Sequence, residues 1–259
     1  MKFIHLSDTH ILARDDYSRH PDATATLGKI IGEINKYHRD AEICVITGDI
    51  THHGHPEQYE QAIAILGDLA IPYILIPGNH DERAAFKQAF PDTPVDENGF
   101  INHGHTFGGV RFVMIDSIVA GAHHGTLCQH RLDWLRNELN AHRDTPTFLF
   151  MHHPPFEMGL PFMDTIRLDA DQELAEIVTA NPQVKHLFFG HLHRPATGTW
   201  QGVPFLLAAS TQCGEPLDFH HDKEEDLEDR NRLNPGYGIA FADSTGGLRY
   251  HFDFIKFDL

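Results

Sequence analysis

The chain has 259 residues, 41% of them hydrophobic and 22% charged, which is typical of a globular protein and predicts a single domain over 1–259. No apolar run approaches the roughly 18 to 20 residues that cross a bilayer, so we expect neither a membrane span nor a signal peptide. The formal net charge of −17 should repel long nucleic acid, unless bound metal cations make the potential positive locally.

The cysteines and histidines indicate which kinds of site and which cellular location the chain can have. Cys44, Cys128 and Cys213 are far apart and form no CxxC pair, so we expect no disulfide framework, and a cytoplasmic location fits best. The 22 histidines outnumber the 20 lysines and arginines together. Because surface histidines are common, only position can separate metal ligands from bystanders.

The first third of the chain alternates between strand and helix patterns. Apolar runs at 2–6, 43–47 and 73–76 predict strands, and apolar residues at helical spacing from Leu27 and from Tyr59 predict helices between them. Alternation of this kind favours a largely parallel sheet.

The middle of the chain continues this alternation. Asp81 stands where a helix N-cap is expected, ahead of a short helix through 84–86. Further strands are predicted at 110–115, 147–151 and 186–189, and further helices at Leu132 to Leu139 and Leu174 to Val178.

The C-terminal part has a different rhythm. Short strands are predicted at 199–200, 205–208, 238–242 and 248–255, with turn signals such as Gly246-Gly247 joining neighbours as hairpins. A parallel first half and a hairpin-rich second half predict an α/β fold with two mixed β-sheets packed face to face. With helices on the outside, this is a four-layer αββα sandwich.

One charge-dense stretch, DFHHDKEEDLEDRNR at 218–232, lies within this C-terminal part. A solvated surface segment is the ordinary interpretation of such a run. Because His220 and His221 open it, the wider segment 214–235 is also a candidate flap or oligomer contact beside an active site.

Polar side chains follow five of the predicted strands, at the point where each strand ends. They are Asp8 and His10 after 2–6, Asp49 after 43–47, Asn79 and His80 after 73–76, His152 after 147–151, and His191 and His193 after 186–189. The carboxyl ends of parallel strands gather along one edge of a sheet, where ligands bind, so these side chains can converge. Chance and core packing do not readily place such residues beside the turn glycines Gly48, Gly78 and Gly190 together.

The residue types point to metal chemistry. Imidazole and carboxylate groups suit zinc, iron and manganese, and seven candidate ligands exceed what one four-coordinate ion needs. A carboxylate can bridge two cations, and two ions about 3.5 to 4 Å apart can clamp the oxygens of a displacement at phosphorus. The sequence therefore predicts two metal ions per chain, of Fe, Mn or Zn.

Taken in order, these motifs resemble the signature of the calcineurin-like metallophosphoesterases. The matching strings are SDTH at 7–10, GDI at 48–50, GNHD at 78–81, HHPP at 152–155 and GHLH at 190–193. Within that superfamily, the short chain and the STQCGEP stretch at 210–216 resemble the class III cyclic nucleotide phosphodiesterases and the bacterial glycerophosphodiesterases.

The resemblance implies a role for each motif residue. One ion would be held by Asp8, His10, Asp49 and His193, and the other by Asp49, Asn79, His152 and His191, with Asp49 as the bridge. A hydroxide between the ions is the expected nucleophile, because metal binding lowers the pKa of water to about 7.

His80 is expected to stay off the metals and to act at the phosphate. The resemblance implies that it helps to stabilise or protonate the leaving oxygen, a task that suits an imidazole. The expected substrate is a small phosphodiester of the cyclic nucleotide or glycerophosphodiester type. By the same resemblance we expect a homo-oligomer, a dimer or larger.

The sequence departs from the family at His52, where relatives commonly carry Asn or Asp. His52, His53 and His55 are candidates for contacting the ligands or the substrate, but a surface-loop role is as good an interpretation, and His103, His123 and His124 are in the same position. For His153 we expect a supporting or structural role rather than coordination.

Three other functions remain open from the sequence. A broad-specificity phosphomonoesterase is the main alternative, because the same two-metal centre can attack either kind of ester. A nuclease is disfavoured by net charge and the lack of a basic patch. A non-catalytic metal-binding scaffold is disfavoured by His80, because such a scaffold has no need of a histidine that binds no metal.

Overall fold

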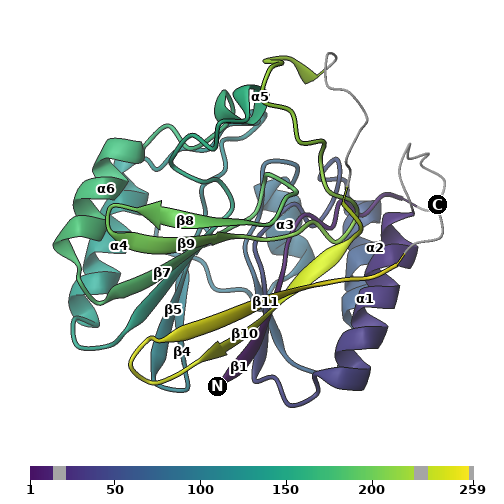
Figure 1. The fold of residues 1–259 in the computed structure, drawn as a ribbon, viewed down its shortest axis with the longest axis horizontal. Helices are drawn as coiled ribbons and strands as arrows, with labels where there is room; N and C mark the ends of the chain where they lie inside the picture. The colour runs from purple at the N-terminus through teal and green to yellow at the C-terminus, as the bar shows by residue number, and fades with distance from the viewer. Residues whose placement is uncertain (14–21, 225–232, 257–259) are drawn as a thin grey trace.

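Two β-sheets lie face to face, with helices on their outer sides (Figure 1). The structure is a computed structural model, and it describes residues 1–13, 22–224 and 233–256. The predicted four-layer arrangement of two mixed sheets flanked by helices is confirmed. Among the described residues, no helix has the length and apolar character needed to cross a membrane.

The first sheet joins the two ends of the chain. Its order is β11 (Leu248–Phe254), β10 (Gly236–Ala242), β1 (Lys2–Leu6), β2 (Ile43–Ile46) and β3 (Tyr73–Leu75). Strands β1, β2 and β3 are parallel, whereas β10 runs antiparallel to β1.

The second sheet is formed from the middle of the chain. Its order is β4 (His103–Phe107), β5 (Val110–Ile115), β6 (Thr147–Met151), β7 (Val184–Phe189), β9 (Val203–Leu207) and β8 (Ala196–Trp200). Strands β5, β6, β7 and β9 are parallel to one another, and β4 and β8 close the edges as antiparallel partners of β5 and β9.

Three hydrophobic clusters fill the three spaces between the four layers. The first sheet packs against α1 (Ala23–Tyr37), α2 (Pro56–Leu66) and α3 (Arg83–Ala89). The second packs against α4 (Gln129–Ala141) and α6 (Asp171–Ala180), and the short α5 (Pro161–Asp164) lies between β6 and α6 along the chain. The third cluster lies between the sheets and is rich in phenylalanine.

The side-chain alternation of each strand explains how one sheet serves two cores. On β1, Ile4 and Leu6 pack toward the helices, while Phe3 packs into the layer between the sheets. On β6, Leu149 faces the helices and Phe148 faces the other sheet. Successive strand residues point to opposite faces, so a strand buried on both faces reads as a continuous apolar run.

One local expectation was wrong, and two features of the sheets do not follow from the sequence pattern. The C-terminal hairpin of β10 and β11 does not belong to a separate sheet but pairs with β1. Strand β4 was not foreseen, because its sequence HGHTF has no apolar run. Asp81 is not the N-cap of α3, since Glu82 takes that position and accepts a hydrogen bond from the backbone N–H of Ala85 at 2.7 Å.

Candidate metal centre

The predicted site residues come from two sheets rather than one. Asp8, His10, Asp49, Asn79 and His80 follow β1, β2 and β3 of the first sheet, and His152, His191 and His193 follow β6 and β7 of the second. The carboxyl ends of both sets of strands meet at the same end of the sandwich. Two distances show this: Oδ2 of Asp49 lies 3.4 Å from Nε2 of His152, and Oδ1 of Asp8 lies 3.5 Å from Nε2 of His193. The structure thus brings all of these residues together.

Strained backbone conformations hold these side chains in place. Asp8, His10, Asp49, His191 and His193 all have positive φ angles, between 45° and 72°. For a residue other than glycine this conformation is uncommon, and it costs on the order of 1 to 3 kcal/mol unless the surroundings enforce it. Strain of this kind gathers at functional sites, and here it coincides with five of the predicted ligands.

Main-chain hydrogen bonds enforce that strain. The N–H of Asp8 donates to the carbonyl of Gly48 at 3.0 Å, and the N–H of His10 donates to the carbonyl of Asp49 at 2.9 Å, which ties the loop after β1 to the loop after β2. The N–H of His191 donates to Oδ1 of Asp8 at 3.0 Å, which ties the second sheet to the first.

Two glycines leave the space that the buried carboxylates occupy. A Cβ at Gly78 would overlap the Asp49 carboxylate, and a Cβ at Gly190 would overlap the Ser7 hydroxyl and come within 3.0 Å of Oδ2 of Asp8. Any side chain at either position would therefore displace the centre. This requirement accounts for glycine in the GNHD and GHLH motifs.

The first group of ligand atoms is compact and buried. Asp8, His10, Asp49 and His193 each offer one atom, and these atoms lie within 4.8 Å of one another. Nε2 of His10 is 2.8 Å from Nε2 of His193 and 3.4 Å from Oδ2 of Asp49. Among the described residues, the buried Oδ2 of Asp8 has no hydrogen-bond partner. Oxygen and nitrogen donors facing one another in this way fit a divalent cation.

The second group shares Asp49 with the first. Nε2 of His152 lies 3.4 Å from Oδ2 of Asp49 and 3.1 Å from Oδ1 of Asn79. His152 donates through Nδ1 to the carbonyl of Thr47 at 2.7 Å, and His191 donates through Nε2 to the carbonyl of Ile166 at 3.1 Å. The first bond leaves Nε2 of His152 facing Asp49 and Asn79, and the second holds the ring of His191, which lines the same cavity as Asp49. Hydrogen bonds of this kind usually orient metal-binding histidines.

His153 is buried beside this group, with its ring 4.7 Å from that of His191. Its Nδ1 lies 2.8 Å from the Ser117 hydroxyl and its Nε2 lies 3.1 Å from the carbonyl of His123. Because both ring nitrogens have protein partners, this geometry supports the structural role expected for His153.

The ionisable groups of the centre perturb one another strongly. Burial raises the pKa of the Asp8 carboxyl, against the opposing influence of His193 and His152. Burial also acts to raise the pKa of Asp49, but His152, His80 and His10 outweigh it and hold that pKa well below its usual range. Burial lowers the pKa of both His10 and His191, which favours the neutral rings that bind metals.

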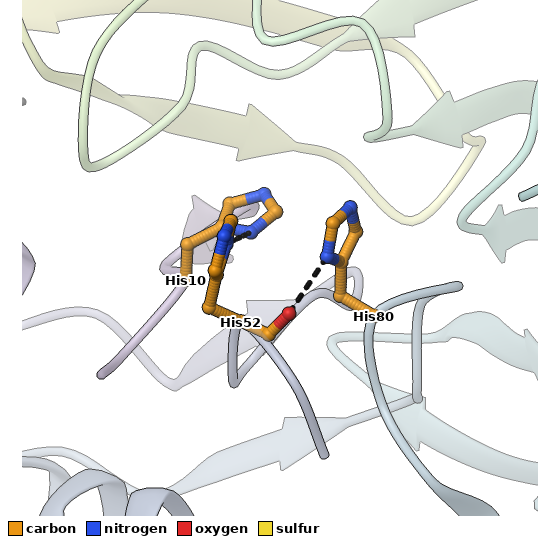
Figure 2. A group of neighbouring side chains, drawn as sticks. All are labelled: His10, His52 and His80. Carbon is orange, nitrogen blue, oxygen red and sulfur yellow. Dashed lines mark hydrogen bonds between the residues drawn. The ribbon is translucent and has the colours of Figure 1, made fainter. Parts of the chain in front are cut away.

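His80 lies next to these ligands and is oriented by main-chain contacts. Its backbone N–H donates to Oδ1 of Asp49 at 2.9 Å, and its Nδ1 donates to the carbonyl of His52 at 2.8 Å (Figure 2). Its Nε2 is the nitrogen left without this tie, and the residue lines the cavity beside Asp49. A carbonyl can only accept, so Nδ1 carries a proton.

His52 contacts two of the site histidines at once. Its Nδ1 lies 3.2 Å from Nδ1 of His10, and its ring stacks on that of His80 at 5.1 Å (Figure 2). His53 and His55 lie farther out, in ring contact with each other at 5.6 Å. Of these three histidines, whose roles the sequence leaves open, the structure places only His52 against the site.

A cavity of about 270 Å³ opens beside the centre. Asp49, Asn79, His80, His191 and His193 line its floor, and His123 is a further lining residue, with Nδ1 3.4 Å from Nδ2 of Asn79. Its apolar wall does not follow from the predicted motifs, and is formed around α5 by Leu160, Phe162, Met163 and Ile166. The apolar residues just after the HHPP motif were the available signal.

The predicted charge-dense segment borders the cavity where it is described. Glu215, Asp218 and Glu224 line one side of the cavity. His221 pairs with Asp218 through Nδ1 at 2.8 Å, and the His220 N–H donates to the same carboxylate at 2.8 Å. Residues 225–232 of the predicted flap, 214–235, lie outside the described residues.

Comparison with known proteins agrees with this geometry. The calcineurin-like phosphoesterase family model matches residues 1–195. The chain is 40% identical over 208 residues to a probable cyclic nucleotide phosphodiesterase of Rhodopseudomonas palustris, covering 79% of this chain and 76% of that protein. It is 32% identical over 262 residues to a probable glycerophosphodiester phosphodiesterase of Arcobacter nitrofigilis, covering 100% and 95%.

Solved structures show the same fold. A dimetal phosphatase from Danio rerio superposes with a TM-score of 0.71 at 13% identity, covering 93% of this chain and 92% of that one. The resemblance expected from the five motifs is therefore confirmed. This chain belongs to the calcineurin-like phosphoesterase family.

Proposed function

We propose that the chain is a two-metal phosphodiesterase that hydrolyses small phosphodiesters of the cyclic nucleotide or glycerophosphodiester type. The convergence of buried donors on Asp49, from the strand ends of both sheets, carries this proposal. The names of the two relatives support diesters as the substrate class.

We assign one ion to Asp8, His10, Asp49 and His193, and the other to Asp49, Asn79, His152 and His191. The mixed oxygen and nitrogen donor set suits Fe, Mn or Zn. When bound, such ions supply Lewis acidity to the attacking and leaving oxygens of an in-line displacement. Asp49 shares its carboxylate between the two positions, and Asn79 adds a neutral oxygen to the second.

His80 is the proposed proton donor to the leaving oxygen. The His52 carbonyl fixes its Nδ1–H, so Nε2 remains to meet the substrate in the cavity. A positioned imidazole in this role typically contributes about 10²- to 10⁴-fold to a rate.

The cavity supports a small substrate rather than a polymer. Its size suits a single small molecule, and the wall formed by Phe162 and Met163 can pack against an ester substituent. The carboxylates of Glu215 and Asp218 face a phosphate-containing polymer unfavourably.

Four further assignments are proposals on narrower support. A single domain over 1–259 is supported by the pairing of β1 with β10, which brings the two ends of the chain into one sheet. A cytoplasmic location is supported by the wide spacing of Cys44, Cys128 and Cys213, which form no CxxC pair. We propose a flap or oligomer-contact role for 214–235, since its described part borders the cavity, and a homo-oligomeric assembly on the family resemblance.

The direct test is hydrolysis by the chain loaded with manganese, zinc or iron. We expect faster turnover of bis-p-nitrophenyl phosphate than of p-nitrophenyl phosphate, and activity toward at least one cyclic nucleotide or glycerophosphodiester. A preference for the monoester would favour the phosphatase alternative. A folded, metal-loaded preparation without activity toward any phosphoester would contradict the proposal.

A further inference from the structure

A polar chain of three side chains, formed by the buried His5 and Thr47 and the half-buried Tyr250, reaches into the layer between the sheets. His5 on β1 is fully buried, with its ring 5.6 Å from that of Phe188. Its Nδ1 lies 2.9 Å from the hydroxyl of Tyr250 on β11, and its Nε2 lies 2.9 Å from Oγ1 of Thr47. Polar groups of this kind rarely enter a phenylalanine-rich layer without a specific role.

A glycine on the intervening strand makes this contact possible. Strand β10 separates β11 from β1, so Tyr250 must cross β10 to reach His5. Gly238 stands opposite His5 in the register, and a Cβ there would overlap the Tyr250 hydroxyl. Glycine within a strand is unfavourable, and here its missing side chain opens the path.

One arrangement of protons satisfies every donor in the chain. The Tyr250 hydroxyl donates to Nδ1 of His5, Nε2–H of His5 donates to Oγ1 of Thr47, and the Thr47 hydroxyl is directed at the Leu6 carbonyl at 3.4 Å. The reverse order leaves the phenol proton without an acceptor among the described residues. Burial lowers the pKa of His5 to about 3, which keeps this ring neutral.

The chain ends on a predicted metal ligand. The main-chain carbonyl of Thr47 accepts from Nδ1 of His152 at 2.7 Å. That bond turns Nε2 of His152 toward Asp49 and Asn79. The position of Thr47 therefore decides which way the His152 ring faces.

We propose that Tyr250 and His5 are positioning residues, which fix Thr47 so that its carbonyl holds the His152 ring in the orientation needed at the centre. Neither residue lines the cavity, so both act through Thr47. The kinetic consequence rests on the proposed function, whereas the structural consequence rests on the hydrogen bonds alone.

The test compares Tyr250→Phe with the matched variant Tyr237→Phe. Tyr237 on β10 also has a buried hydroxyl contact to a histidine, 3.3 Å from Nε2 of His38, and another to Asp253 at 3.1 Å. Each substitution removes one hydroxyl from the C-terminal hairpin, but among the described residues no chain of hydrogen bonds leads from Tyr237 to His152. A general loss of stability would therefore affect both variants, and a positioning effect only one.

For Tyr250→Phe we expect kcat on bis-p-nitrophenyl phosphate and Mn²⁺ affinity each to fall about tenfold, as for other residues that orient metal ligands. We expect KM to stay within about twofold, because the cavity is untouched. In the metal-free protein, the Nδ1–H resonance of His152 should shift or broaden in an NMR spectrum. Tyr237→Phe should leave kcat, Mn²⁺ affinity, KM and the His152 resonance unchanged.

A second pair of variants tests the intermediate residue. Thr47→Val removes the hydroxyl and should reproduce the effect of Tyr250→Phe. Thr47→Ser keeps the hydroxyl and should show the His152 resonance at its wild-type position. If the wild-type enzyme is active and Tyr250→Phe and Tyr237→Phe behave alike, the inference is overturned. A wild-type enzyme without activity would instead contradict the proposed function, and the resonance would then decide the inference alone.

Discussion

The same strands build two regions of opposite character. Between the sheets, Phe3, Phe112, Phe150 and Phe188 pack ring against ring, with Phe150 and Phe188 stacked at 4.5 Å. A few residues beyond the ends of β1 and β2, Asp8 and Asp49 are buried as carboxylates in strained backbone. One region buries apolar surface in regular structure, and the other buries charge in irregular structure.

The difference teaches how the strain is supported. A buried carboxylate and a positive φ both oppose folding, whereas each fully buried apolar side chain stabilises it by roughly 1.5 to 3 kcal/mol. The phenylalanine layer therefore holds the strand ends where the centre needs them. Changes at the centre should lower activity more than stability, and changes in the layer should do the reverse.

The largest expected effect is that of Asp49→Asn. Asparagine has the same shape but cannot bridge two cations as a carboxylate does, so we expect kcat/KM to fall at least about ten-thousandfold, roughly 5.5 kcal/mol. Metal analysis should show loss of at least one ion per chain, while the metal-free variant still unfolds cooperatively. Retention of both ions and of most activity would show that Asp49 is not shared.

Phe188→Ala should produce the reverse pattern. Removing this ring from the layer between the sheets leaves a cavity, and we expect the free energy of unfolding to fall by about 4 kcal/mol in urea titrations. Activity per folded molecule should stay near that of the wild type. A loss of activity as large as that of Asp49→Asn would break the distinction between the two regions.

His80→Ala should have an effect of intermediate size, and it should lower turnover without changing metal binding. Since His80 is a proposed proton donor and not a ligand, we expect kcat to fall about a hundredfold with metal content unchanged. His53→Ala, a change in the neighbouring histidine loop, serves as the control and should leave kcat unaltered. Loss of metal from the His80 variant would show that this histidine coordinates an ion.

The smallest expected effect is a pH dependence of the metal-free protein's stability. Burial, with a contribution from His105, lowers the pKa of His103 from 6.5 to about 3. Between pH 6.5 and about pH 3, His103 takes up a proton in the unfolded chain but not in the folded chain. The contribution of His103 to the free energy of unfolding is therefore fully present above pH 6.5 and is lost as the pH falls toward 3. The slope is about 1.4 kcal/mol per pH unit for each such histidine.

Urea unfolding in chelator at pH 7 and pH 5 measures this slope. His103→Gln should flatten it by one histidine's contribution, whereas His251→Gln, at an exposed position of β11, should leave it unchanged. Identical slopes in all three proteins would show that His103 does not stay neutral in the fold.

The sequence by itself determined the local elements and the candidates. Apolar runs identified β1 over 2–6, β5 over 110–115 and β6 over 147–151 with the bounds that the structure has. The polar residues that follow β1, β2, β3, β6 and β7 named the site, because a carboxylate or imidazole at a strand end is a short-range feature that needs no knowledge of the fold.

Only the tertiary structure decided how the elements combine. The pairing of β10 with β1, and the supply of ligands from two sheets, depend on contacts between residues about 200 positions apart, which no local period encodes. For the same reason the local pattern predicts a helix cap at Asp81, whereas its carboxylate accepts from the N–H groups of Ile50 and Gly78. Hydrogen-bond partners of buried polar groups are set by packing, and packing is a property of the whole chain.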